Sequence, residues 1–192
     1  MDAVSSGLLI FKPRPSNSGL GVAIPGAFML VVAIALFLFR DLVPSVVVWI
    51  VGLVFVLLGV MLIGMGVFFR WAIISMKYVL TQDTLTIIGG SIRYDVPIAE
   101  IERAYARDIN NTARNNQPFS ANAVNTPGLA LANVTWRDTG LLKMCGTSWK
   151  DVVLIVTPQQ TYGITPLDTD AFLAELGRRG VTIGQAATDT NP

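Results

Sequence analysis

Two pairs of closely spaced carboxylates come nearest to a catalytic arrangement in this chain: Glu100 with Glu102, and Asp168 with Asp170. Paired carboxylates can divide general acid and general base roles when their surroundings separate their pKa values. Glu100 and Glu102 fall at a predicted strand corner beside two arginines, which favours solvated charge. Asp168 and Asp170 fall at the start of a predicted helix, where negative charge is favourable whatever the function. Neither pair therefore predicts catalysis.

The remaining reactive groups are few. The chain has no histidine, which removes the commonest general base and metal ligand and excludes an axial histidine for haem or chlorophyll. Its single cysteine, Cys145, can form neither an intramolecular disulfide nor a thiolate metal cluster, so we interpret it as a small core residue. Neither G-x-x-x-x-G-K-[ST] nor G-x-S-x-G occurs. We therefore expect no catalytic centre, no cofactor, no metal and no small-molecule substrate.

Composition points to a membrane protein. The 192 residues have a mean hydropathy of +0.56 and are only 14% charged, against about 25% in a soluble domain. The uncharged stretches 20–39 and 46–69 are each long enough to cross about 30 Å of hydrocarbon. A short polar turn joins them, which predicts an antiparallel two-helix hairpin over residues 20–69. We do not interpret the first stretch as a cleaved signal peptide, because it is too long and a second span follows directly.

The charges and aromatic rings at the ends of the two spans suggest an orientation. Cations on the side of the chain ends are Lys12, Arg14, Arg70 and Lys77. Because Arg40 alone lies in the turn, the positive-inside rule predicts a multi-pass protein of the cell (inner) membrane with both termini cytoplasmic. Trp49 and Trp71, near opposite ends of the second span, suit the two aromatic belts of a bilayer. The net charge of +1 gives no case for nucleic acid as a partner.

Small residues mark one face of each span. Gly52, Gly59 and Gly66 recur every seven residues, close to two helical turns, so they share a face that another backbone can approach. Ala23 and Ala27 form a small-xxx-small pair in the first span. Two interpretations remain open. The stripe packs the hairpin against itself, or it is a docking face for a larger membrane complex.

After the spans, short alternating segments predict a sheet-rich domain over residues 77–180, preceded by a segment 1–19 ahead of the spans and followed by a flexible tail, 181–192. Expected strands lie at 78–80, 85–87, 92–97, 102–109, 129–136, 140–146, 151–158 and 159–166. The first three or four form a meander. A helix at 168–180 begins with Asp168 as N-cap and ends at Gly180. The predicted fold class is therefore a membrane α-hairpin plus an α+β domain, a curled antiparallel sheet or partly open barrel with a C-terminal capping helix.

Three stretches carry a resemblance to a known family: YVLTQDTLTI, YDVPIAEIERA and VVLIVTPQQTYGITPLDTDAFLAEL. They are similar to the successive strand, corner and helix signatures of bacterial PH-like (pleckstrin-homology-like) domains. The resemblance covers residue 77 to about residue 180, and its motifs are packing signatures. Members of that family often follow N-terminal membrane spans. The layout of two spans and a small PH-like domain is also similar to that of certain photosystem assembly proteins, which implies an assembly or scaffolding role and no chemistry.

The function we expect is therefore that of an accessory subunit or assembly factor, with an integral membrane protein complex and the lipid bilayer as partners. The Asn-rich loop 110–128 is a candidate contact segment, with Phe119 as an apolar anchor and Arg114 as a polar contact. The alternative is a membrane-surface sensor of lipid or envelope state. Against it, the loop between the first two strands is TQDT, without Lys or Arg, and basic and acidic residues roughly balance after residue 77.

Overall fold

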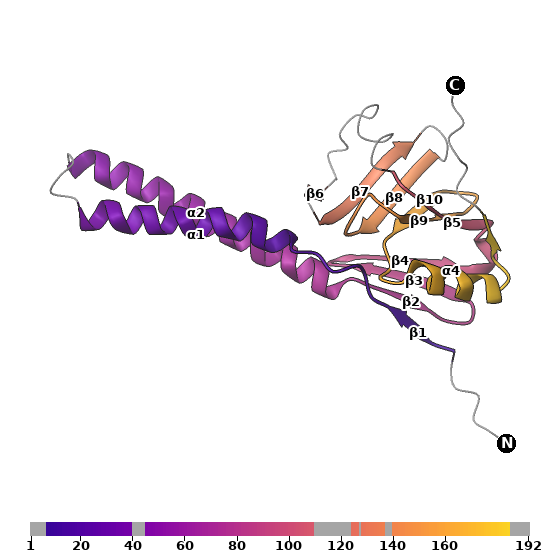
Figure 1. Cartoon of the computed structure of the whole chain (residues 1–192). Coiled ribbons are helices and arrows are strands. Elements are labelled where there is room, and N and C mark those ends of the chain that lie inside the picture. The colour runs from indigo at the N-terminus through magenta and orange to yellow at the C-terminus, as the bar shows by residue number, and fades with distance from the viewer. Residues whose placement is uncertain (1–6, 40–44, 110–123, 127, 137–139, 185–192) are drawn as a thin grey trace, which may run out of the picture. The chain divides into compact units, whose positions relative to one another are not determined.

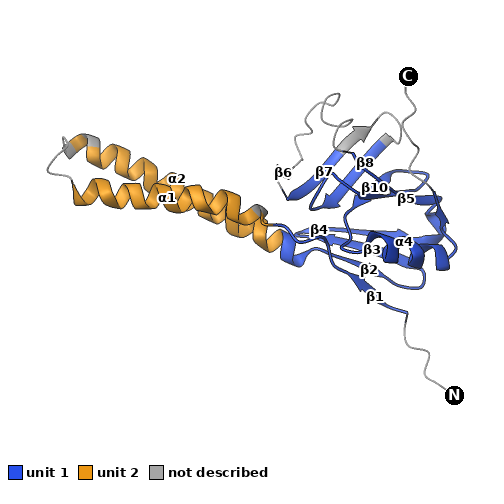
Figure 2. Ribbon diagram, viewed as in Figure 1, with its two compact units in different colours: residues 1–16, 73–192 blue, residues 17–72 orange. Residues whose placement is uncertain are grey.

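The computed structural model describes residues 7–39, 45–109, 124–126, 128–136 and 140–184. It divides into two compact units, residues 17–72 and residues 1–16 with 73–192 (Figure 2). Residues 17–72, orange in Figure 2, contain only helices, and the blue unit contains all the described strands. Each unit is described by itself below.

The helical unit consists of α1 (Ser18–Leu38) and most of α2 (Ser45–Ser75) (Figure 1). Both helices contain a stretch long and apolar enough to cross a membrane, Gly19–Leu38 and Val48–Ser75. At about 1.5 Å per residue, α1 is about 31 Å long, which matches the hydrocarbon layer. The second helix does not end near Phe69, where the uncharged stretch ends, but continues through Arg70 to Ser75. Arg70 can extend its long side chain to place its charge in water while its backbone stays helical, so this charge does not mark where the helix ends.

The other unit contains two sheets that lie across from each other (Figure 1). The first sheet has the strand order β1-β2-β3-β4 and is antiparallel throughout. Its strands are β1 (Leu9–Phe11), β2 (Lys77–Leu80), β3 (Thr84–Gly89) and β4 (Ile92–Pro97). The predicted meander is present in β2, β3 and β4. The fourth strand of this sheet is β1, which comes from the segment ahead of the helices, where the sequence suggested no strand.

The second sheet has the order β11-β5-β9-β10-β8-β7-β6. Its strands are β5 (Arg103–Arg107), β6 (Val124–Thr126), β7 (Leu129–Trp136), β8 (Gly140–Gly146), β9 (Val152–Val156), β10 (Thr161–Ile164) and β11 (Thr182–Ile183). Neither sheet closes on itself, so the domain is a pair of curled sheets and not a barrel. The 3-10 turn η2 (Ile98–Glu100) carries the chain from β4 to β5.

Two pairings in the second sheet depart from a purely antiparallel arrangement. The hairpin of β9 and β10 inserts β10 beside β8, and these two strands are parallel, with Tyr162 opposite Lys143. The short strand β11 pairs in parallel with β5, within a region expected to be tail. Both pairings join strands that are far apart in the sequence, so their direction depends on tertiary placement and not on local sequence.

The second sheet has buried side chains on both faces. Leu142 and Met144 of β8 belong to a cluster with Val152, Leu154 and other residues, around which the sheet curls. Cys145, which alternates with them, is also buried and faces the first sheet, since a Cβ atom on Gly89 of β3 would meet the Cys145 sulfur. Helix α4 (Thr169–Arg178) lies beside β5 and β11 and buries Phe172 and Leu176 fully. Its predicted N-cap is present, with the Asp168 carboxylate accepting from the Ala171 N–H at 2.9 Å.

Candidate functional site

Within the hairpin, the glycine stripe of α2 faces α1. A Cβ atom on Gly66 would lie 2.8 Å from the Gly19 carbonyl oxygen and 2.9 Å from the Ala23 Cβ. On Gly59 it would lie 2.8 Å from Leu30 Cδ2, and on Gly52 2.8 Å from the Phe37 ring. All three glycines are therefore occupied by contacts inside the hairpin. The sequence reasoning did not single out Gly19 and Gly26 of α1, which supply the backbone that approaches most closely.

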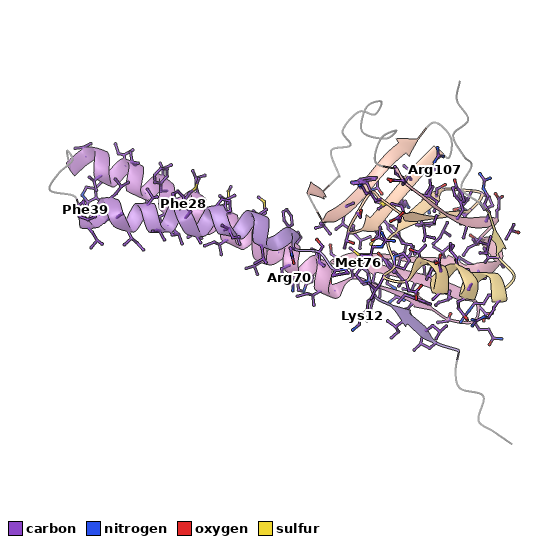
Figure 3. All side chains as sticks on the ribbon, in the orientation of Figure 1. Lys12, Phe28, Phe39, Arg70, Met76 and Arg107 are labelled. Atoms are coloured by element: carbon purple, nitrogen blue, oxygen red, sulfur yellow. The ribbon has the colours of Figure 1, made fainter. Side chains whose placement is uncertain are left out.

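The outward faces of the two helices carry large apolar side chains. Phe28 of α1, labelled in Figure 3, is 67% exposed. Of the predicted alanine pair, Ala23 lies against Gly66 of α2, and Ala27 is exposed. Trp49 packs edge-on against Phe37, with ring centroids 5.4 Å apart, and remains 66% exposed, while Trp71 is 50% exposed. At about 1.5 Å per residue these two tryptophans are about 33 Å apart along the helix axis, close to the thickness of a hydrocarbon layer.

The segment ahead of α1, residues 7–16, which we call the N-terminal strap, lies along the sheet domain. Its strand β1 pairs with β2, with Phe11 opposite Tyr78. The Phe11 ring packs edge-on against Phe172 of α4 at a centroid distance of 5.0 Å. Further along, the Leu167 N–H donates to the Lys12 carbonyl oxygen at 2.9 Å. The strap therefore belongs to the same compact unit as the sheets, which the predicted boundary at residue 19 did not anticipate.

Charged side chains fix both ends of the strap. The Arg14 guanidinium donates to the Asp151 carboxylate at 2.9 Å and to the Thr169 hydroxyl at 3.2 Å. At the other end, Arg179 donates to the Gly7 carbonyl oxygen at 3.0 Å while also pairing with Glu175. Asp151 adopts a positive φ of 46°, which non-glycine residues other than Asn and Asp seldom do. Its carboxylate thus reaches the strap from a turn of unusual geometry.

The strap and the start of β2 form the two chain connections between the units. Because β1 and β2 are antiparallel, the last residue of β1 and the first residues of β2 lie at the same end of the sheet. From Phe11 the chain reaches α1 at Ser18, and from Ser75 it enters β2 at Lys77. At that end the Gly90 N–H, in the turn between β3 and β4, donates to the Ser75 hydroxyl at 3.1 Å.

Tyr78 is the buried polar centre of the domain. Its hydroxyl donates to the Cys145 carbonyl oxygen at 2.9 Å and accepts from the Thr165 N–H at 3.2 Å. Burial raises the pKa of this phenol far above its ordinary value. Cys145 is itself buried, and burial raises the pKa of its thiol to about 12. Both groups are therefore neutral at physiological pH, and the hydrogen bond from Tyr78 to the Cys145 backbone joins the two sheets.

The carboxylates considered at the outset do not gather into a site. Glu100 and Glu102 are exposed around η2, and Asp170 is exposed in the first turn of α4, beyond the N-cap Asp168. Within the described ranges, no group of three or more His, Cys, Asp or Glu side chains is placed to hold a metal ion. The predicted contact residues Arg114 and Phe119 lie outside the described residues.

One cluster brings together reactive side chains that sequence reasoning did not single out. The Lys143 ammonium of β8 lies 5.0 Å from the ring centroid of Tyr94 in β4 and 6.0 Å from that of Tyr162 in β10. The two rings are themselves 5.5 Å apart. Lys143 and Tyr94 are half-buried, and Tyr162 is buried. We call these three residues the Lys143 cluster. The three residues lie on three different strands, and no local signal joins β4 to β8 and β10.

The comparisons with known proteins identify the family. The sequence model of the bacterial PH domain family matches residues 76–180, which is more than half of the chain, and the chain belongs to this family. The matched region runs from Met76 through the end of α4, so it contains every described strand except β1 and β11. No curated protein and no solved structure was found to match. The resemblance inferred from the strand and corner motifs is thus confirmed.

Proposed function

We propose that this chain is a non-catalytic, membrane-anchored PH-domain protein that serves as an accessory subunit or assembly factor of a larger integral membrane protein complex. The observation that carries the proposal is the double attachment of the domain to the hairpin. Short connections link Phe11 to α1 and α2 to Lys77, and both connect to neighbouring strands of one sheet. Two short connections tether the domain to the apolar helices, which raises its effective concentration toward membrane partners.

The free edge of β1 is the surface we assign to the partner. In the described part of the domain, β1 forms one edge of the first sheet and pairs only with β2. Its exposed side chains are apolar, with Leu9 40% and Ile10 58% exposed. An exposed apolar edge strand is a template for pairing with an extended segment of another chain. Because only a few residues separate this edge from α1, the partner segment we expect is an extended juxtamembrane segment of an integral membrane protein.

The glycine stripe supports a different role from docking. Since Gly52, Gly59 and Gly66 contact α1 within the hairpin, we assign them to the internal packing of the two helices and leave contacts with other membrane proteins to the outward faces. For orientation, we propose both chain ends in the cytoplasm of an inner membrane, on the charge bias of the flanking cations. A C-terminal reporter that is active only in the cytoplasm tests that orientation. Its activity supports it, and inactivity at normal expression contradicts it.

The test of the proposed function is purification of tagged full-length protein from its native membrane in mild detergent, with mass spectrometry of co-eluting proteins. Ile10→Lys places a charge on the β1 edge, and Leu167→Lys is the matched control, because Leu167 is equally exposed at 60% but lies outside the strands. We expect a stoichiometric integral membrane protein that is lost with Ile10→Lys and retained with Leu167→Lys. Retention by both variants would contradict the assignment of the β1 edge. Partner-free wild-type protein would contradict the subunit role and favour the sensor alternative.

A further inference from the structure

The strap is held to the sheet domain by few contacts, and several of them are exposed. Its strand β1 pairs with β2 over three residues, and two of these, Leu9 and Ile10, are 40% and 58% exposed. The third, Phe11, packs its ring edge-on against Phe172. The ion pair of Arg14 is partly exposed as well, and such pairs contribute little to stability. A strand held in this way can open locally while the rest of the domain stays folded.

The surface under the strap is fully buried. Tyr78 and Leu80 lie opposite β1 in the sheet, and Phe172 lies against Phe11. All three residues have an exposed fraction of 0%. Release of the strap therefore uncovers the backbone edge of β2 and one side of the Phe172 ring. Because burial of apolar surface is favourable, the strap stays docked unless a force acts on it.

The connections from this strand pair to the two helices are short, and one of them is stiff. After Arg14, only residues 15–17 precede α1, and Met76 alone separates α2 from β2. Proline fixes its own φ and confines the residue before it to extended conformations. Pro13 and Pro15 therefore make the connection to α1 a semi-rigid spacer. A displacement of α1 relative to α2 acts on β1 and β2 with little slack.

The helices are in backbone contact at the end where these connections leave. A Cβ atom on Gly19, the second residue of α1, would lie 2.6 Å from the Gly66 carbonyl oxygen and 3.0 Å from the Arg70 Cβ. Towards the other end of α2, a Cβ on Gly52 would instead meet the ring of Phe37. The tightest packing of the hairpin thus lies next to the strap and β2 in the chain.

We propose that the strap couples the packing of the two apolar helices to the sheet domain. Because β1 and β2 are antiparallel, both connections leave from the end of the pair where Phe11 lies opposite Tyr78. Separating α1 from α2 at Gly19 and Gly66 loads first the contacts of Arg14 and then that end of the strand pair. Close helix packing keeps β1 docked on β2, and separation releases it.

This coupling lies within one chain, so it does not depend on the accessory-subunit role. It has a consequence for the surface of the domain, because the β1 edge exists only while the strap is docked. The packing of the two helices therefore controls whether that edge or the edge of β2 is available.

The experiment is hydrogen–deuterium exchange of full-length protein in detergent, read by mass spectrometry in peptides that cover β1 and β2. Gly66→Leu inserts a side chain between the helices at the end that leads to β2, because its Cβ meets the Gly19 carbonyl oxygen at 2.8 Å. Gly52→Leu is the matched control. A Cβ there also lies 2.8 Å from α1, at the Phe37 ring, but about 21 Å further along the helix axis. Gly64→Leu adds the same side chain where nothing lies within 4 Å of the Cβ.

A second change tests whether the strap carries the effect. A short run of glycines inserted between Ser16 and Asn17 lengthens and softens the connection to α1 and leaves every residue of β1 in place. In this background Gly66→Leu still separates the helices, but the insertion takes up the displacement. Gly66→Ala is a milder variant for both backgrounds, since it brings only a Cβ against Gly19.

We expect Gly66→Leu to accelerate exchange at residues 9–11 and in β2 about tenfold, and Gly66→Ala to act in the same direction. Gly52→Leu and Gly64→Leu should leave these rates unchanged, and the glycine insertion should abolish the effect of Gly66→Leu. Slow exchange in β9 shows that the domain of each variant is folded. Unchanged exchange at residues 9–11 in both Gly66 variants would overturn the proposal. Equal acceleration by Gly52→Leu, or the same acceleration with the insertion as without it, would also overturn it.

Discussion

Arg14 and Asp151 are separated by 137 positions in the chain, yet the Arg14 guanidinium donates to the Asp151 carboxylate at 2.9 Å. The pair ties the strap, immediately ahead of α1, to the turn between β8 and β9. Together with the β1–β2 pairing, it makes the segment before the first apolar helix part of the folded domain. The two apolar helices are thus an insertion between the first and second strands of one sheet.

The Arg14–Asp151 pair should contribute modestly to holding the strap against the domain. The two side chains are 29% and 66% exposed, so we expect Arg14→Met to destabilise the strap by at most about 1 kcal/mol. Hydrogen–deuterium exchange of the full-length protein in detergent should accelerate at residues 9–14 and remain unchanged in β9. Lys12→Met is the control, since the contact of Lys12 with Leu167 uses only its backbone. Equal exchange in Arg14→Met and wild type would show that the Arg14 side chain does not hold the strap.

The glycine stripe yields a prediction with an internal control. Gly66→Leu should destabilise the hairpin by about 1–3 kcal/mol, because a Cβ at that position meets the Gly19 backbone at 2.8 Å. Gly64→Leu should have little effect, since nothing lies within 4 Å of a Cβ there. The measurement is the thermal midpoint of full-length protein in detergent. If both variants lowered the midpoint equally, membrane-helix propensity and not close packing would explain the stripe.

Local patterns were sufficient to predict most elements of this domain. Alternation of apolar residues located β2, β3 and β4, and the Asp168 cap and Gly180 bracketed α4. These signals are contained within a few neighbouring residues, which is why sequence alone reveals them.

Features that depend on distant partners were not predictable in the same way. The three residues of β1 become a strand only because β2 offers an edge, and the parallel β8–β10 pairing depends on where a later hairpin inserts. The Lys143 cluster joins three strands whose proximity no local pattern encodes. The glycine stripe is intermediate, because its period identified a contact face but not the helix that fills it.

The Tyr78 hydroxyl should contribute measurably to stability. Tyr78→Phe leaves the Cys145 carbonyl oxygen and the Thr165 N–H without their buried partner, which should cost about 1–3 kcal/mol. Thermal unfolding of the full-length protein, monitored by tryptophan fluorescence, measures the loss. Tyr105→Phe is the comparison, because the Tyr105 side chain contributes to the core through its ring and should lose much less. If Tyr78→Phe were as stable as the wild-type protein, a water molecule would have to replace the lost hydroxyl.

The single thiol provides a probe of domain opening. Burial raises the pKa of Cys145 from 9.0 to about 12, so at pH 8 the thiolate population is on the order of 1,000-fold lower than for a free thiol. Below pH 9.0, the thiol is protonated in both the folded and the unfolded protein, so it adds no pH dependence to stability. Above pH 9.0, the unfolded protein loses this proton and the folded protein keeps it, so the free energy of unfolding falls as pH rises. We expect maleimide to label native full-length protein very slowly at pH 8 and rapidly in denaturant. Rapid labelling of the native wild-type protein would contradict the buried position of Cys145.

A variant tests the packing around this thiol. Gly89 packs against the sulfur, so Gly89→Ala should loosen the two sheets and accelerate labelling of the native protein. Gly7→Ala is the control, because a Cβ on Gly7 lies in open space, and it should leave the labelling rate unchanged.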